Sequence, residues 1–273
     1  PGRMMAYVIW DISPEIFEGV TFFRWYGLCW VLGILVGQRI MVSIYRTEGI
    51  SVGEVDRLSI YMMLGALIGA RFGHILFYDP IYYLHNPVEI LPIKINPSFQ
   101  FTGLAGLASH GGIAGALLAL YLYNRKAKKN YWWLLDRLMI AGAALGGFIR
   151  VGNLLNSEII GTPSNVPWAF IFTRVDFIPR HPSQLYEAVF YFIVTIALYF
   201  VWKSRRFSVA HGFIFGLGMA LIFTQRFLIE FLKENQMPFE EALTLNMGQM
   251  LSLPLIVGGV VVIVWSRRGR YDI

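Results

Sequence analysis

The sequence predicts an all-α polytopic membrane protein, with seven transmembrane helices and a small irregular head on the outer side. Apolar residues make up 56% of its 273 residues and charged residues only 15%, whereas soluble chains carry about 25% charged residues. The apolar residues gather in long runs that match the thickness of a bilayer. The basic residues gather in alternate connections between those runs, as they do in multi-pass membrane proteins.

Seven apolar runs define the expected helices. They are residues 20–45, 57–78, 108–124, 134–156, 182–202, 211–232 and 247–266. The third run is short for a full crossing and is rich in Gly and Ala. Residues 4–19 are polar enough to lie at the membrane surface, as a strand pair or as an interfacial segment. We expect residues 1–273 to form a single membrane-embedded domain.

Three basic regions set the expected orientation. They contain Arg125, Lys126, Lys128 and Lys129, then Lys203, Arg205 and Arg206, and finally Arg267, Arg268 and Arg270. In a seven-span chain these regions share one side of the membrane, which the positive-inside rule assigns to the cytoplasm. The N-terminus then faces the outer side and the C-terminus the cytoplasm. The same rule explains the formal net charge of +6 without a nucleic-acid partner.

The connection at residues 157–181 predicts the head. It is sparse in Lys and Arg, and proline residues break it up. Its aromatic residues are Trp168, Phe170, Phe172 and Phe177, and its prolines are Pro163, Pro167 and Pro179. We expect it to form an irregular cap on the outer surface.

The most informative polar stretch, residues 146–161, begins inside the fourth apolar run and ends outside it. In a helix, Arg150, Asn153 and Ser157 fall on one face, at spacings of three and four. An arginine is costly in hydrocarbon, and such residues usually face a bundle interior and serve a function. The alternative is that Arg150, about two turns from the polar end, extends its guanidinium to the lipid headgroups.

Two further polar positions occur in the outer half of the expected bundle. Tyr26 is either an interfacial anchor or a site residue. His110 opens the third run, beside Gly111 and Gly112, whose missing side chains allow a ligand to approach the backbone. His110 itself is either a base or a polar residue satisfied at the mouth of a span.

Charged residues also occur at the start of the fifth run and within the second and sixth. Pro182 marks a helix start, after which Gln184 and Glu187 either cap the helix or contact a ligand. Arg226 and Glu230 lie four residues apart and could form a structural ion pair. Together with Arg71 and Arg150, Arg226 indicates an anionic ligand, such as a phospholipid headgroup, because guanidinium groups match phosphate oxygens.

Several kinds of site are excluded by what the sequence lacks. Its one cysteine, Cys29, lies in an apolar run and cannot build a disulfide framework or a zinc site. There is no closely spaced Asp/Glu motif for Mg²⁺, no P-loop and no G-x-S-x-G elbow. We therefore expect no metal and no cofactor.

Six ordered motifs resemble those of the bacterial prolipoprotein diacylglyceryl transferases, over nearly the whole chain. They are Arg24-Trp25-Tyr26-Gly27-Leu28, Ala70-Arg71-Phe72-Gly73, His110-Gly111-Gly112, the block from Arg150 to Gly161, Arg180 to Glu187, and Arg226 to Glu230. The block Arg-x-Gly-Asn-x-x-Asn-x-Glu-x-x-Gly is that family's signature. The resemblance implies a seven-span bundle in the bacterial inner membrane, with a periplasmic head and a periplasmic N-terminus.

The resemblance also implies an activity. Such enzymes transfer the diacylglyceryl group of phosphatidylglycerol to the lipobox cysteine thiol of a prolipoprotein, within membrane lipids and without a cofactor. The products are a thioether and glycerol phosphate. By resemblance, Tyr26, His110, Arg150 and Arg226 take part in catalysis. The implied substrate-binding residues are Arg71, Gly111, Gly112, Arg150, Asn153, Asn156, Glu158, Gly161, His181 and Glu230.

The chain departs from the family pattern at four positions. Ile149 and Leu154 stand where Gly and Phe are commoner, and His74 stands where Tyr is common. These three changes are consistent with altered packing. Ile222 stands where the family often has Tyr, so a hydroxyl group has no role at that position here.

The implied chemistry is a displacement at the glycerol carbon that bears the phosphate. We expect Arg150 and Arg226 to stabilise the leaving phosphate, while Asn153 and Tyr26 orient the headgroup. Thiolate formation requires either a base, for which His110 is the candidate, or a local positive field that lowers the thiol pKa.

Glu230 is expected to hold Arg226 in place.

The alternative function class is a transporter or lipid-binding membrane protein that uses the same arginines to hold an anion. Transporters often show paired halves or broken helices at corresponding positions, and the sequence shows neither.

Overall fold

The computed structural model describes residues 7–17, 19, 23–91, 93–94, 100–101, 108–204, 210–234 and 244–268, and it is mostly helical. The helices are α1 (Trp25–Thr47), α2 (Gly53–Phe77), α3 (Pro80–His85), α4 (Ser109–Ala127), α5 (Tyr131–Leu155), α6 (Ser183–Lys203), α7 (Phe213–Ile229) and α8 (Met247–Arg268), with 3-10 turns η1 (Pro87–Ile90) and η2 (Glu230–Leu232). The strands are β1 (Val8–Trp10), β2 (Ile93–Lys94), β3 (Gln100–Phe101), β4 (Phe170–Phe172) and β5 (Pro179–Arg180). The basic residues Arg205, Arg206 and Arg270, which we used for orientation, lie outside the described residues.

Six helices in the described part of the chain are long and apolar enough to cross a membrane. They are α1, α2, α5, α6, α7 with η2, and α8. The third predicted run does form a helix, α4, but α4 is not among the six. Its first turn contains His110 and two glycines and its last turn contains Arg125 and Lys126, so less of its length is apolar. A seventh crossing by α4 therefore stays a prediction.

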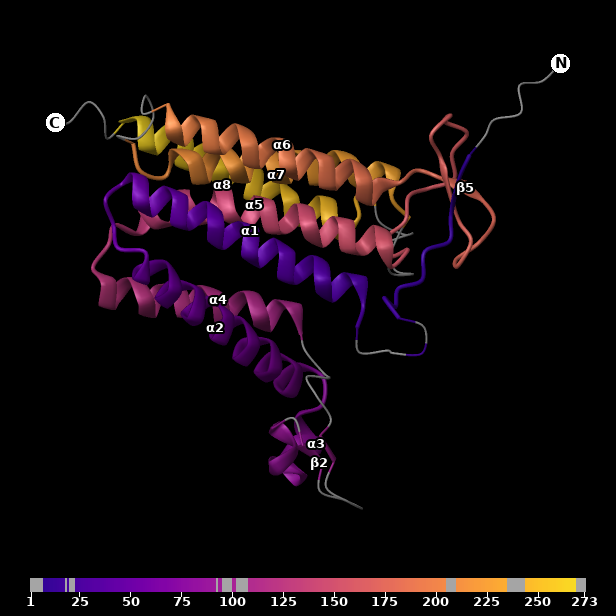
Figure 1. The fold of residues 1–273 in the computed structure, drawn as a ribbon, viewed down its shortest axis with the longest axis horizontal. Coiled ribbons are helices and arrows are strands. Elements are labelled where there is room, and N and C mark those ends of the chain that lie inside the picture. Colours follow the sequence, from indigo (N-terminus) through magenta and orange to yellow (C-terminus); the bar gives the residue numbers. More distant parts are fainter. Residues whose placement is uncertain are drawn as a thin grey trace. The chain divides into compact units, whose positions relative to one another are not determined.

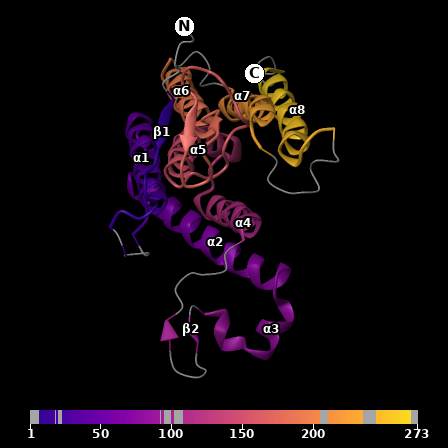
Figure 2. The same ribbon diagram turned by 90° about the vertical axis from the view of Figure 1, so that its right-hand side faces the viewer.

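The chain divides into two compact units, which we describe separately. Residues 1–44 and 132–273 form the first unit, and Tyr45–Tyr131 forms the second. In the first unit, α5, α6, α7 and α8 run alongside one another with the main part of α1 (Figure 1). In the second unit, α2 packs along α4, and α3 and β2 lie beyond the C-terminal end of α2 (Figure 2).

In the first unit, α1 approaches α5 closely at Gly152. At Gly152 a side chain would meet the ring of Tyr26, because a Cβ there would lie 2.8 Å from a ring carbon. The same Cβ would lie 3.3 Å from Cys29. The buried Cys29 is therefore a packing residue, and Tyr26 is held against the end of α5 that carries Asn153.

A three-stranded sheet makes the head more regular than we expected. Strand β1 pairs in parallel with β4, with Val8 opposite Phe170, and β4 pairs antiparallel with β5. The N-terminal strand thus pairs with the 157–181 segment, and it has no strand partner among the described residues of the 4–19 stretch. Along β4 the side chains alternate, so that Phe170 and Phe172 are both buried on one face of the strand.

The head is anchored to the end of α5 by a small apolar core. Leu154, Phe170 and Phe172 form its buried centre, against which Trp10, Ile160 and Leu185 pack. Trp10 also donates from its indole Nε1 to the carbonyl oxygen of Leu154, at 3.0 Å. The departure at Leu154 is consequently a packing position, as the sequence indicated.

In the second unit, glycines bring α2 and α4 into backbone contact. A Cβ on Gly73 would lie 2.7 Å from the Cα of Gly111, and a Cβ on Gly69 would lie 2.7 Å from the Cα of Gly115. Small residues at this spacing let two helices approach closely where no hydrophobic effect distinguishes protein from lipid.

Candidate active site

Arg150 lies in the last turns of α5, and only 13% of its side chain is exposed. Its Nε lies 3.3 Å from Oε2 of Glu187 on α6. Its Nη1 donates to Oδ1 of Asn153, one turn further along α5, at 3.4 Å. The predicted helical face of Arg150 and Asn153 is confirmed. Ser157 does not continue it, because α5 ends at Leu155 and Ser157 has a left-handed backbone with φ of 54°.

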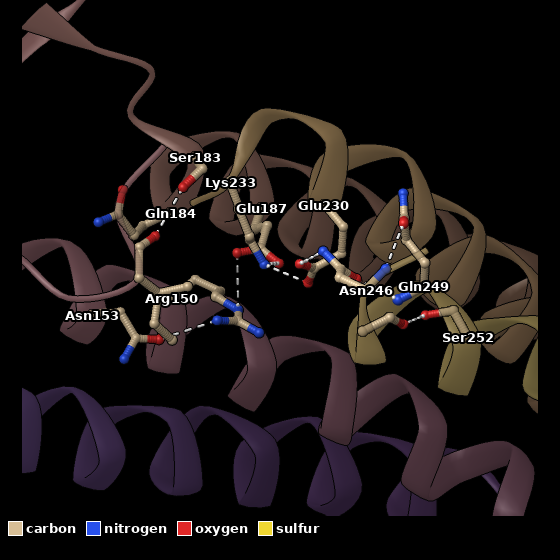
Figure 3. Close-up of polar contacts among 12 residues, drawn as sticks. Arg150, Asn153, Ser183, Gln184, Glu187, Glu230, Lys233, Asn246, Gln249 and Ser252 are labelled. Carbon is tan, nitrogen blue, oxygen red and sulfur yellow. Dashed lines mark hydrogen bonds and ion pairs between the residues drawn. The ribbon is translucent and has the colours of Figure 1, made fainter. Parts of the chain in front are cut away.

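A buried chain of charges continues from Arg150 to the end of α7. Glu187 is fully buried, and its Oε1 accepts from Nζ of Lys233 at 2.9 Å. The same ammonium group donates to Oε1 of Glu230 at 3.1 Å. Figure 3 shows the alternation of charges from Arg150 through Glu187 and Lys233 to Glu230. Two carboxylates and two cations thus neutralise one another where neither sign alone would be stable.

Glu230 does not hold Arg226 as expected. Among the described residues its side-chain partners are Lys233 and Asn246, whose Nδ2 donates to Oε2 at 3.1 Å. The reason is local: α7 ends at Ile229 and η2 begins at Glu230. In a 3-10 turn, residues three apart eclipse each other, so Lys233 stands over Glu230. The side chain of Arg226 instead interacts electrostatically with Tyr191 on α6, as does Arg150.

The loop after α5 is tied to the start of α6. Gln184 donates from Nε2 to the carbonyl oxygen of Glu158 at 2.6 Å, and Ser183 donates from Oγ to that of Ile159 at 2.9 Å. The sequence left Gln184 either as a helix cap or as a ligand contact. In the structure it has a structural role, because it holds the loop after α5. The bonds hold Ile159 in a left-handed conformation, with φ of 55°, which costs about 1–3 kcal/mol for a non-glycine residue.

Gly161 ends this loop in a site with no room for a side chain. A Cβ there would lie 2.7 Å from the Cβ of His181 and 2.8 Å from the carbonyl oxygen of Leu232. Its N–H donates to the carbonyl oxygen of His181 at 3.2 Å. Gly161 thus joins the end of the loop to the start of α6 and to η2, which carries Glu230.

A cavity of about 580 Å³ opens beside the α5 loop. Tyr26, Arg24 and Leu28 line it from the α1 side, and Asn156 and Glu158 line it from the loop. Glu158 connects the cavity to Arg150. Its two carboxylate oxygens accept from Asn156 at 3.1 Å and from Asn153 at 3.3 Å, and Asn153 in turn contacts Arg150. Five predicted site residues, Tyr26, Arg150, Asn153, Asn156 and Glu158, therefore lie near one another at one end of the first unit.

His110, Gly111, Gly112 and Arg71 belong to the second unit. His110 is exposed at the start of α4, and its ring centroid lies 5.2 Å from that of Phe77 on α2. Gly111 serves the contact with α2 described above. Gly112 would place a Cβ 3.4 Å from the carbonyl oxygen of Ala66, which is ordinary contact.

Arg71 holds the segment that follows α2. Its Nη2 donates to the carbonyl oxygen of Glu89 at 2.6 Å and its Nε to that of Ile90 at 3.0 Å. Its guanidinium also lies over the ring of Tyr83, 5.2 Å from the centroid. These contacts give Arg71 a structural role in the second unit.

His181 lies in the head, outside the charged chain. Its Nδ1 lies 3.3 Å from the hydroxyl of Tyr186, which accepts from Nε1 of Trp168 at 2.7 Å. Its neighbour Arg180 is buried between the carboxylates of Asp176 and Glu234. Hydrogen bonds from Arg180 hold the pKa of Asp176 below its ordinary value.

Two contributors to the charged chain were missed by sequence reasoning, Lys233 and Asn246. Lys233 follows the predicted run at residues 211–232, and its pairing depends on the 3-10 turn at Glu230. A spacing of three between Glu230 and Lys233 at the end of an apolar run is the signal that could have indicated it. Within the described residues, no group of three or more His, Cys, Asp or Glu side chains is placed to hold a metal ion.

These features define a class: a polytopic membrane protein with a buried, charge-balanced polar site at one end of its helices. The sequence profile of the family described as prolipoprotein diacylglyceryl transferase matches residues 14–265. The chain belongs to this family.

Curated relatives support the assignment over almost their whole length. A phosphatidylglycerol–prolipoprotein diacylglyceryl transferase of Bacteroides fragilis is 46% identical to this chain, over 94% of the chain and 95% of the relative. Proteins of the same name from Chloroherpeton thalassium and Tolumonas auensis are each 40% identical, over 96% of the chain and over 95% and 99% of the relative.

Proposed function

We propose that this protein is a phosphatidylglycerol–prolipoprotein diacylglyceryl transferase. It takes the diacylglyceryl group from phosphatidylglycerol and attaches it to the lipobox cysteine thiol of a prolipoprotein. The observation that carries the proposal is the placement of Arg150, largely buried, held by Glu187 and Asn153, and adjacent to the cavity-lining Glu158 through Asn153. A preorganised guanidinium suits a reaction in which a phosphate group leaves.

The bond changes balance without a cofactor. The cysteine thiol gives up its proton, and the resulting thiolate attacks the glycerol carbon that bears the phosphate. The carbon–oxygen bond to the phosphate breaks, its electrons leave with the oxygen, and glycerol phosphate departs. Negative charge grows on the leaving phosphate, which is where Arg150 and Arg226 stabilise the transition state.

The other site residues are proposed to bind or orient the substrates. Asn153 and Tyr26 orient the headgroup from either side of the α1–α5 contact. Asn156, Glu158 and Gly161 shape the loop beside the cavity. His110 is the proposed base for the thiol, and Gly111, Gly112, Arg71 and His181 are assigned to substrate binding by the family resemblance.

Glu230 receives a role different from the one we first expected. Its contacts with Lys233 and Asn246 support the view that it fixes Lys233 between two carboxylates. Lys233 in turn fixes Glu187, the ion-pair partner of Arg150. Glu230 therefore acts as a positioning residue, separated from the leaving phosphate by Lys233, Glu187 and Arg150.

The protein works in the bacterial inner membrane, as one membrane-embedded domain in which α4 is the seventh span. The basic end of the α4–α5 connection lies in the cytoplasm with the C-terminus. The N-terminus and the head at residues 157–181 lie in the periplasm, where secreted prolipoproteins present their cysteine. Its partners are phosphatidylglycerol, prolipoproteins and membrane lipids.

One assay separates this function from the transporter or lipid-binding alternative. The purified protein in detergent is given phosphatidylglycerol, a lipobox peptide, or both. The enzyme should release glycerol phosphate only when both are present, and a Cys→Ser lipobox peptide should abolish release. Binding of phosphatidylglycerol without any release would overturn the proposal.

A further inference from the structure

A second cavity lies in the second unit, at the end opposite His110. It has a volume of about 410 Å³ and lies between the N-terminal turns of α2 and the C-terminal turn of α4. His110 starts α4, whereas Tyr123 and Lys126 line the cavity from its other end. At 1.5 Å per residue these positions are about 20 Å apart along the helix, so the cavity is separate from the end that carries the candidate base.

The cavity is electropositive. Arg57, Lys126 and Lys129 line it, against a single carboxylate, Glu54, which leaves a net charge of +2. Both oxygens of Glu54 have protein partners: Oε1 accepts from Arg57 at 3.2 Å and Oε2 from the hydroxyl of Tyr123 at 2.9 Å. The lining is thus suited to an anion that can interact with several cations at once.

The aromatic wall of the cavity is rigid. Tyr123 is buried, and its ring meets that of Tyr61 edge to face, with centroids 5.7 Å apart. The bond from Tyr123 to Glu54 connects α4 to the first turn of α2. The lining is therefore preorganised by the packing of the two helices, which lowers the cost of ordering a ligand there.

Apolar helix faces lead directly from the cavity. On α2, Leu64 follows Tyr61 by three residues and is 52% exposed. On α4, Leu122 precedes Lys126 by four residues and is 49% exposed. Residues at these spacings share a helix face, so a charged headgroup in the cavity would have its acyl chains along exposed apolar side chains.

We propose that this cavity binds the headgroup of an anionic phospholipid. The ligand class follows from the combination of a net positive lining with two adjoining apolar faces, since basic clusters at the end of a membrane helix attract anionic headgroups. In the orientation proposed above, the lipid belongs to the cytoplasmic leaflet. The site shares no lining residue with the cavity beside the α5 loop, and the reaction does not require it.

The chain offers a matched test, because Arg57 and Lys126 line the cavity whereas two further basic residues near the end of α4, Arg125 and Lys128, do not. Full-length protein in detergent is titrated with phosphatidic acid, which carries the phosphate but lacks the donor's glycerol headgroup, and bound lipid is counted by native mass spectrometry. Arg57→Gln/Lys126→Gln should weaken retention of one lipid about thirtyfold, as expected from two lost basic contacts. The control Arg125→Gln/Lys128→Gln removes the same charge from exposed positions outside the lining and should change retention less than twofold.

Two further arms fix the ligand class. Phosphatidylcholine should bind equally to wild type and both double variants, and inorganic phosphate should not displace phosphatidic acid. Equal loss in both double variants, or no loss in either, would overturn the site in favour of diffuse charge. Displacement by inorganic phosphate would overturn the lipid assignment in favour of a water-soluble anion. Glycerol phosphate release is measured alongside and should be unaffected, so a failure of the transferase proposal is recognised independently.

Discussion

Two sets of helices in this protein are held together by different kinds of contact. In the second unit, α2 and α4 meet through glycines, and backbone touches backbone. In the first unit, α5, α6 and η2 meet through Arg150, Glu187, Lys233 and Glu230, whose charges balance. The first contact depends on shape alone and tolerates no added volume. The second depends on the presence of every partner, since removing one leaves its neighbour charged and buried.

The largest expected effect comes from the candidate base at the edge of the glycine contact. His110→Gln keeps a polar side chain of similar size but cannot accept the thiol proton. Turnover of glycerol phosphate should fall by about 10²–10⁴-fold, the usual contribution of a general base, without change in thermal stability. Near-normal turnover at neutral pH would remove His110 from this role and leave thiol activation to the positive field of the arginines.

The next effect tests Arg150, which begins the charged chain. Arg150→Ala should lower turnover by about 10²–10³-fold, because a contact to developing charge is lost. Arg150→Lys should recover only part of it, since an ammonium group keeps the charge but not the planar fork. Full activity in the Lys variant would show that charge alone suffices and would contradict the bidentate contact with phosphate.

Lys233→Met breaks the charged chain at its centre and should reduce the stability of the fold as well as turnover. It leaves Glu187 and Glu230 buried without their shared cation, at an expected cost of about 3–5 kcal/mol. The measurement is thermal unfolding of the protein in detergent. Adding Glu230→Gln should restore part of the loss, and Lys203→Met, an exposed lysine at the end of α6, is the matched control. If the single variant unfolds like wild type, the chain does not act as a unit.

A larger side chain at the glycine contact between α2 and α4 should destabilise the protein. Gly111→Val places methyl groups against the backbone of Gly73 and should cost about 1–3 kcal/mol, as overpacking does. Gly142→Ala is the control, because its Cβ would meet no atom within 4 Å and alanine favours a helix. If Gly111→Val unfolds like wild type but is inactive, Gly111 serves the approach of a substrate and not the helix contact.

The smallest effect is expected in the head and depends on pH. Because bonds from Arg180 lower the folded-state pKa of Asp176, this carboxylate stabilises the head above the ordinary aspartate pKa of about 3.9. The contribution is lost as the pH falls below that value and through the lower folded-state pKa. In Asp176→Asn the drop in thermal stability between neutral and acidic pH should be smaller than in wild type. An identical pH profile would show that Asp176 does not contribute.

The sequence predicted best what depends on neighbouring residues in one helix. The apolar runs became helices within a few residues of the expected ends, and Arg150 and Asn153 share a face as their spacing requires. Six helices qualify as candidate spans, whereas the polar ends of α4 make its hydropathy ambiguous.

What the sequence could not predict depends on geometry at helix ends and on distant pairing. The change from α7 to a 3-10 turn directs the side chain of Glu230 to Lys233 and not to Arg226. The spacing of residues in a continuous α-helix does not predict that change. Glu187 had two open readings because its partners come from α5 and η2, far away in sequence. The pairing of β1 with β4 was also hidden, since both strands are only three residues long.

The parallel pairing of β1 with β4 has a consequence for biogenesis. Trp10 bonds to Thr173, 163 positions later, so the N-terminal strand leaves the ribosome long before its partner has been made. In the topology proposed above, it remains on the outer side of the membrane while α1 to α5 are inserted, and it can join the head only after residue 172 has been delivered to the same side. Closure of the head is therefore a late step in the maturation of the newly made chain, and a bulky fusion at the N-terminus should delay that step while leaving the insertion of the helices unaffected.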